Sequence, residues 1–130
     1  MKKIKRGEIR LCDLGEEYGS IQGGVRPVLI VQNNKGNKYS PTALVCPITS
    51  KTKYKAKLPT HMVLTKNMGL KQTSLLLTEQ IITVNKFSIG RKITHLSPSM
   101  MKKADNCMGI SLSLSKHRHK NIYYKKKRKK

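Results

Sequence analysis

Apolar residues along this chain fall mostly in short runs separated by polar turns, the pattern typical of β-strands. The clearest run spans residues 26–33, and its β-branched core predicts a strand buried on both faces. Pro47 lies inside another run and predicts a sheet edge or a bulge there. Short strands at this spacing, with a polar turn over 33–41, predict a small closed or half-closed barrel. The other predicted strands span residues 8–14, 42–50, 59–65 and 73–84.

The pattern changes to a helical period near the end of the body. Ser97 can cap a helix that has Pro98 at its first position. Apolar residues then recur every three or four positions on one face, which we interpret as core or dimer packing rather than a ligand site. Gly109 weakens the last turn of this predicted amphipathic helix. The apolar face consists of Met100, Met101, Ala104, Cys107, Met108 and Leu112.

Charge divides the chain into two parts. It has 28 Lys and Arg against 6 Asp and Glu, a net charge of +22. Residues 116–130 hold nine of these 28 and no acid, which leaves +13 of the +22 on residues 1–115. We therefore expect one domain over 1–115 and a disordered basic tail over 116–130. Such charge attracts polyanions, namely nucleic acid, acidic lipid or an acidic protein.

The tail has two open interpretations. It could bind RNA by neutralising phosphates while Tyr123 and Tyr124 stack on bases. Alternatively, it adds charge and affinity without any selective role.

The remaining composition concerns location and cofactors. No apolar run is long enough for a membrane helix, and no apolar signal region follows the basic N-terminus, so we expect a cytoplasmic protein without membrane contact. The cysteines, Cys12, Cys46 and Cys107, are odd in number and far apart, so we expect buried free thiols and no zinc site.

Several kinds of active site are disfavoured. The 6 carboxylates are scattered, whereas a two-metal nuclease needs a cluster of acids, so we expect neither metal nor cofactor. Neither a phosphate-binding glycine–lysine loop nor a serine-hydrolase elbow is present. His61 and His95 could in principle form an acid–base pair, but ordinary hydrogen bonds on strands are the simpler interpretation.

One arginine stands out. Arg26 lies between a glycine-containing loop and the buried strand, and a guanidinium offers phosphate a charged planar fork. RNA can be cleaved by its own 2′-hydroxyl, so the protein needs only to orient the phosphate, stabilise charge and assist proton transfer. A hydroxyl near the end of the 42–50 strand, such as that of Thr49, can donate to the same phosphate. The alternative is an ordinary ion pair between Arg26 and Glu16 or Glu17.

Six motifs occur in an order that resembles the MazF/PemK family of toxin endoribonucleases, the RNA-cutting halves of bacterial toxin–antitoxin pairs. They span about residues 4–114. The motifs are RGEIRLCDL (6–14), GSIQGGVRPVLIVQN (19–33), GNKYSPTALVCPITS (36–50), KAKLPTH (55–61), TEQIITVNK (78–86) and KITHL (92–96).

The resemblance implies a fold, an activity and partners. The fold would be an SH3-like barrel with short helices, forming a homodimer with an RNA groove across it. The activity would be metal-independent and ribosome-independent cleavage of single-stranded mRNA at a short sequence, leaving a 2′,3′-cyclic phosphate or 3′-phosphate and a 5′-hydroxyl. A cognate antitoxin would place an acidic segment in the same groove, and the pair would bind DNA.

The resemblance also implies roles by position. Arg26 matches the family's catalytic arginine and Thr49 its catalytic threonine. Ser50 is added as a second phosphate donor because it adjoins Thr49. The expected RNA-binding residues are Ser20, Gln22, Gly23, Gly24, Ser50 and Gln80.

Some positions depart from the family pattern. Ile21 replaces a usual acid and Ile82 a frequent arginine, while Arg10 and Leu11 stand where aromatic residues are common. Two alternatives therefore remain. One is a catalytically inactive nucleic-acid-binding module, and the other is a toxin of the same fold that poisons a topoisomerase through its C-terminal helix.

Overall fold

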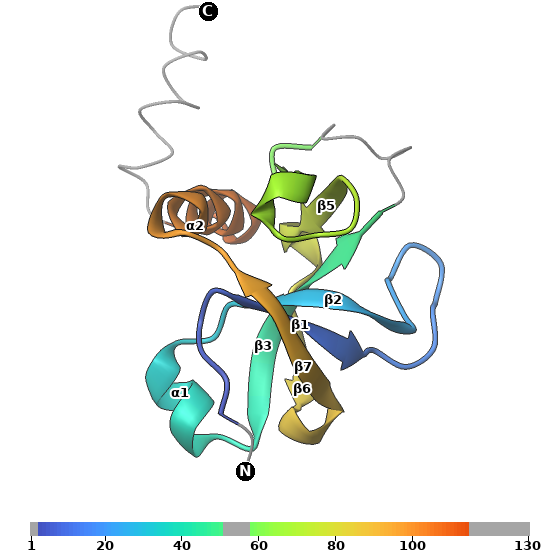
Figure 1. The fold of residues 1–130 in the computed structure, drawn as a ribbon, viewed down its shortest axis with the longest axis vertical. Coiled ribbons are helices and arrows are strands. Elements are labelled where there is room, and N and C mark those ends of the chain that lie inside the picture. Colours follow the sequence, from blue (N-terminus) through green and yellow to red (C-terminus); the bar gives the residue numbers. More distant parts are fainter. Residues whose placement is uncertain (1–2, 51–57, 115–130) are drawn as a thin grey trace, which may run out of the picture.

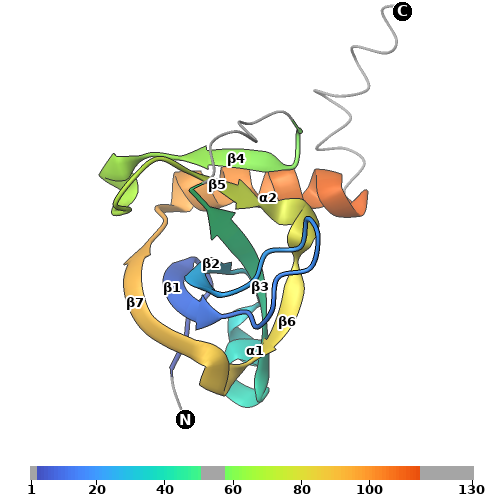
Figure 2. The ribbon, with the colours of Figure 1, turned by 90° about the vertical axis from the view of Figure 1, so that its right-hand side faces the viewer.

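The described part of the chain is built around one strongly curved antiparallel sheet. The computed structural model describes residues 3–50 and 58–114, in which seven strands are paired in the order β4-β5-β3-β2-β1-β7, with β6 also paired to β3 (Figure 1). No ladder joins β7 to β4 or β6 within these residues, so the barrel is half-closed (Figure 2). The strands are β1 (Glu8–Asp13), β2 (Val25–Ile30), β3 (Thr42–Thr49), β4 (His61–Leu64), β5 (Ser74–Leu77), β6 (Ile82–Asn85) and β7 (Ile89–His95).

The prediction of one strand over residues 73–84 was wrong. A 3₁₀ turn, η3 (Thr78–Gln80), divides it into β5 and β6. Both strands pair with the same edge of β3, since β5 meets its end at Ile48 and β6 meets its beginning. Pro47 lies between these two ladders, at a position where neither ladder needs a hydrogen bond from its backbone nitrogen. The proline therefore marks the point at which β3 changes partners.

Two further elements were not predicted. The expected turn over 33–41 contains a short helix, α1 (Asn34–Tyr39), which Asn33 caps by accepting a hydrogen bond of 2.8 Å from the Gly36 N–H. Strand β7 pairs with β1 alone and carries exposed cations, so its apolar alternation is weak. An edge strand of this kind has little hydrophobic pattern to detect.

The C-terminal helix confirms the predicted capping. Helix α2 (Pro98–Leu112) begins after Ser97, whose hydroxyl accepts a hydrogen bond of 3.3 Å from the Met100 N–H. Ala104 and Met108 are buried against the sheet. Leu112 is exposed, so the prediction that it belongs to the packed apolar face was wrong. This helix packs over one face of the sheet and does not combine the length and apolar character that crossing a bilayer demands; nor does any other described helix.

The two faces of the sheet carry separate cores because side chains alternate along each strand. We call the first the helix-side core, since α2 packs on it, and the second the strand-side core. The helix-side core includes Ile9, Leu29, Cys46, Ile48, Leu76, Ala104 and Met108. The strand-side core includes Cys12, Val28, Ile30, Ala43, Val45 and Ile89.

All three cysteines are free thiols, as expected. Desolvation raises the pKa of Cys46 to about 12, with a further contribution from the charge of Glu79. Desolvation and the charge of Asp13 raise the pKa of Cys12 to about 11. These two thiols are therefore neutral core side chains. The expected disorder of residues 116–130 lies outside the described residues.

Candidate functional site

Arg26 lies on the strand-side face of the sheet. In the β1–β2 ladder it is directly opposite Cys12, which belongs to the strand-side core. Its side chain is half-buried, and Nε donates a hydrogen bond of 2.8 Å to the carbonyl oxygen of Gly23. Both terminal nitrogens make no hydrogen bond to a described residue, and no ion pair joins Arg26 to Glu16 or Glu17. The guanidinium is thus held at its base and available at its tip.

Thr49 lies on the same face as Arg26. The β2–β3 ladder ends at the pair of Val28 with Pro47, and Arg26 and Thr49 each lie two positions beyond that pair in their strands. Because side chains alternate along a strand, Arg26 is on the same face as Val28, and Thr49 is on the same face as Pro47. The two expected catalytic residues therefore share a face of the sheet near the ends of neighbouring strands.

The two residues differ in their access to solvent. Thr49 is only 1% exposed, whereas Arg26 is half-buried. The threonine hydroxyl is out of reach in this conformation, so its use on a substrate requires neighbouring structure to move.

The β1–β2 loop is fastened to η3 by a single side chain. Gln80 accepts a hydrogen bond of 3.0 Å from the Gln22 N–H and donates one of 2.8 Å to the Ser20 carbonyl oxygen. These two bonds act at loop backbone atoms rather than at side chains. The Gln22 side chain is buried at 3% exposure, and its amide oxygen makes no hydrogen bond. The expected RNA contact of Gln22 is not available while the loop is closed.

Gly23 and Gly24, the two adjacent glycines at the end of this loop, are required for different structural reasons. Gly24 adopts a φ of +73°, which other residues rarely adopt. At Gly23 a Cβ would lie 2.5 Å from the backbone nitrogen of Glu17. The absence of a side chain at Gly23 therefore lets the loop pack on itself. This is a structural reason for the glycine, beside the expected close approach of a substrate.

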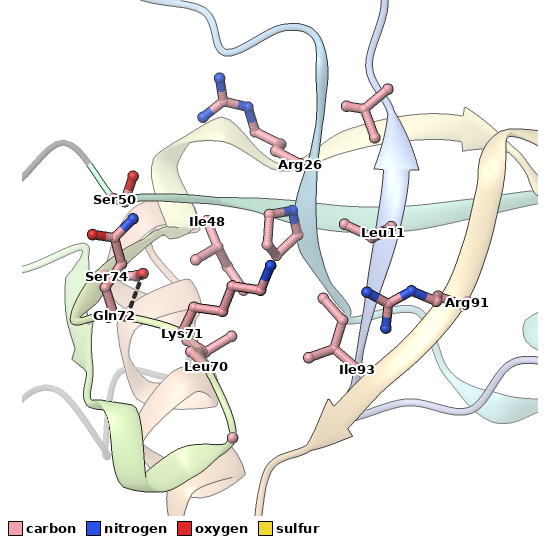
Figure 3. Close-up of a pocket in the computed structure, with 13 residues that line it drawn as sticks. Leu11, Arg26, Ile48, Ser50, Leu70, Lys71, Gln72, Ser74, Arg91 and Ile93 are labelled. Atoms are coloured by element: carbon pink, nitrogen blue, oxygen red, sulfur yellow. Dashed lines mark hydrogen bonds between the residues drawn. The ribbon is translucent and has the colours of Figure 1, made fainter.

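A cavity of about 450 Å³ opens on the other face of the same strand ends. Arg26 stands at its rim, with the guanidinium toward the side of Ser50, while Lys71 extends into its middle and Arg91 lies opposite (Figure 3). Its apolar surface comes from strand residues that continue the helix-side face and from the segment before β5. The lining comprises Leu11, Val25, Arg26, Pro27, Ile48, Ser50, Gly69, Leu70, Lys71, Gln72, Ser74, Arg91 and Ile93.

Sequence reasoning missed most of the polar lining of this cavity. Lys71 and Gln72 come from the segment before β5, Ser74 is the first residue of β5, and Arg91 comes from the unpredicted β7. The only signal of Lys71 and Arg91 in the sequence was positive charge, which is spread over the whole chain, and Gln72 and Ser74 gave none. Of the expected site residues, the cavity contains only Arg26 and Ser50.

The histidines take part in ordinary strand contacts. His61 Nε2 lies 2.9 Å from Glu79 Oε2, and His95 lies opposite Glu8 in the β1–β7 ladder. The interpretation of His61 as a hydrogen-bonded strand residue is confirmed. Among residues 3–50 and 58–114, no three side chains of His, Cys, Asp or Glu are grouped as a metal site.

The sequence matches one family model and a characterised relative. The model for PemK-like, MazF-like toxins of type II toxin–antitoxin systems matches residues 5–112. Endoribonuclease EndoA from Bacillus subtilis (strain 168) is 49% identical over 112 residues, covering 85% of this chain and 96% of the relative.

Solved structures share the fold. An endoribonuclease from Mycobacterial species, in complex with its cognate antitoxin, matches with a TM-score of 0.70 and 25% identity over 88% of this chain and 98% of its own. MazF from Deinococcus radiodurans matches with a TM-score of 0.73 over 88% and 100% of the two chains. Its identity is 16%, so this second match shows similarity of fold alone.

Proposed function

Because the chain belongs to the PemK-like, MazF-like family of type II toxins, we propose that it is an endoribonuclease that cuts single-stranded messenger RNA at a short sequence, without ribosome or metal. The observation that carries this proposal is the position of Arg26 and Thr49 on one face of two neighbouring strand ends. A cationic cavity adjoins Arg26, and the chain's net charge of +22 favours a polyanionic substrate.

The proposed reaction uses the RNA's own nucleophile. The 2′-hydroxyl oxygen attacks the adjacent phosphorus, its proton leaves, and the bond to the 5′-oxygen breaks as that oxygen takes up a proton. Arg26 donates its free terminal N–H groups to the non-bridging oxygens, where negative charge grows. Thr49 contributes a second donor, with Ser50 next to it. The products are a 2′,3′-cyclic phosphate, which can open to a 3′-phosphate, and a 5′-hydroxyl.

In our proposal the β1–β2 loop opens for this chemistry to proceed. Thr49 is buried, and the loop beside Arg26 is fastened to η3 by Gln80. In our proposal RNA displaces the loop, and the loop residues then contact the RNA. These residues are Ser20, Gln22, Gly23 and Gly24. Gln80, released from the loop backbone, offers its amide to the RNA.

The proposed partners follow from charge and family. We propose a cytoplasmic homodimer whose groove binds RNA or the acidic segment of a cognate antitoxin, and a toxin–antitoxin complex that binds DNA. The high positive charge supports both polyanionic occupants. A matched structure contains an endoribonuclease with its cognate antitoxin, which supports such a pair here.

One observation favours a second function. The burial of Thr49 is what a catalytically inactive RNA-binding module of the same fold would show. For a topoisomerase poison acting through α2, no observation on the described residues gives such support.

The test is incubation of the whole protein with a long single-stranded RNA in excess EDTA. We expect cuts at a few sites, with 5′-hydroxyl ends, and their loss in Arg26→Ala. An intact RNA that is nevertheless shifted on a gel would establish the binding module instead. Cutting that stops when EDTA is added would contradict the metal-free mechanism.

A further inference from the structure

The cavity on the helix-side face has polar groups that the proposed reaction does not use. Arg26 touches it only at the rim, and Thr49 is not part of its lining. Lys71, Gln72 and Arg91 have no assigned role, yet all three side chains border the same space of about 450 Å³. That volume falls within the range of about 300–1,000 Å³ typical of small-ligand pockets.

We propose that this cavity receives one unstacked RNA base next to the cleaved phosphate, and that Gln72 determines which base is accepted. This inference rests on the proposed function, because it takes Arg26 as the residue at the phosphate. Sequence-specific proteins read single-stranded RNA by holding splayed bases against flat surfaces and by hydrogen-bonding their edges.

The walls of the cavity match the two surfaces of a base. Pro27, Ile48 and Ile93 line the cavity and supply apolar atoms on which the flat face of a ring can lie. Gln72 and Ser50 stand together on one side, where they can meet the polar edge of that ring (Figure 3). Apolar walls accept the flat face of any base, so discrimination between bases depends on hydrogen bonds to their edges.

Gln72 is better placed for this role than the neighbouring hydroxyl. Its side-chain amide offers both a donor and an acceptor and makes no hydrogen bond to another described residue. Ser74 Oγ instead donates a hydrogen bond of 3.0 Å to the Gln72 carbonyl oxygen, so it orients the backbone of the turn that carries Gln72. The amide is therefore free to select, while Ser74 positions it.

Two cations border the same space from different elements. Lys71 precedes β5 and Arg91 lies in β7, and neither forms an ion pair with a described residue. We assign them to the phosphates that flank the bound base. Such contacts hold the strand in register without reading its sequence.

The experiment maps cleavage ends across a pool of transcripts for the wild type, Gln72→Ala and Thr73→Ala. Thr73 is exposed and adjacent but does not line the cavity, so it is the matched control. We expect Gln72→Ala to reduce discrimination at one position of the cleaved motif by about 5- to 150-fold, the range for a lost bidentate base contact. Thr73→Ala should keep the wild-type motif.

The outcomes separate this inference from the function on which it rests. If the wild type cuts no RNA, the proposed function fails. If the wild type cuts and Gln72→Ala keeps the same motif, or slows cutting equally at all sequences, the base-reading role of Gln72 is wrong. Arg91→Ala supplies a second measurement. We expect it to bind all sequences more weakly, and the slope of log K against log salt concentration should be smaller by about one. A changed motif in Arg91→Ala would contradict its assignment to phosphate.

Discussion

The two faces of the β2–β3 strand ends form different kinds of surface. The strand-side face carries Arg26, which is half-buried, and Thr49, which is 1% exposed. On the helix-side face, Pro27 and Ile48 form part of an open cavity of about 450 Å³. The alternation of a strand therefore places Arg26 and Thr49, our proposed phosphate donors, on one side and the cavity lining on the other, one residue apart in sequence.

In our proposal this difference separates catalysis from recognition. A change on the strand-side face should lower the rate at every cleaved sequence, because the donors act on the phosphate that all sequences share. A change at Gln72, in the cavity on the helix-side face, should alter which sequences are cut. The following predictions test this division, from the largest expected effect to the smallest.

Replacing Arg26 by Ala should reduce kcat/KM by about 10²–10³-fold, the loss typical of removing one preorganised donor to a growing negative charge. Arg26→Lys should recover only part of the rate, because a lysine lacks the planar fork. Single-turnover cleavage of a defined RNA measures both. The cut sequence should remain that of the wild type, and a loss below about tenfold would count against the assigned role.

Replacing Thr49 by Val keeps the shape of the side chain and removes its hydroxyl. We expect kcat to fall by about 10- to 100-fold with little change in KM, because the hydroxyl acts in the transition state. Thr78→Val is the matched control, since Thr78 is also buried and its hydroxyl donates a hydrogen bond of 2.6 Å to the Thr60 carbonyl oxygen. The control should lose about 1 kcal/mol of stability and retain cleavage. Equal rates in Thr49→Val and the wild type would favour the binding module.

Replacing Gln80 by Ala removes both hydrogen bonds that fasten the β1–β2 loop. The Gln22 amide, which Gln80 protects, should exchange about tenfold faster, as expected for about 1.4 kcal/mol of lost closure. Native-state hydrogen exchange measures this rate, with the Leu29 amide in β2 as the internal reference. Unchanged exchange at Gln22 would mean that other contacts close the loop.

The buried thiols give the smallest effect and involve both cores. The pKa of Cys46 is raised from 9.0 to about 12 and that of Cys12 from 9.0 to about 11, chiefly by burial. Thiols in the unfolded chain therefore ionise first, so stability is unaffected below pH 9 and falls as the pH rises toward 11–12. In thermal melts, Cys46→Ala should have a lower Tm than the wild type at pH 7. Above pH 9, its Tm should fall by a few degrees less than that of the wild type. A parallel decline would exclude Cys46 as a contributor.

Much of the local structure could be predicted from the sequence. Strand β2, the Ser97 cap and the packing of Met108 follow from apolar runs and capping chemistry that act within a few residues. The division of 73–84 at η3 could not be predicted, because an apolar run does not show where a strand changes partners. Strand β7 was missed for a related reason, since its edge position and charges hide the alternation.

The site was predicted only in part. Motif resemblance selected Arg26 and Thr49, and strand periodicity placed each on a face. Their placement on one shared face depends on the β2–β3 register, in which Val28 pairs with Pro47 from a distant part of the chain. The lining of the cavity depends on β1, β2, β3, β7 and the segment before β5 meeting in space.

The amino-acid sequence by itself determined the β class, the capped C-terminal helix and the positive charge, and it supplied the prediction that Arg26 and Thr49 act on a phosphate. Those properties depend on side-chain chemistry and on short-range periodicity. Only the tertiary structure decided that Thr49 is buried, that Gln80 fastens the loop and that Gln72 borders a cavity with Arg91. These facts depend on contacts between distant segments, and periodicity assigns a residue to a face without saying what will lie against it.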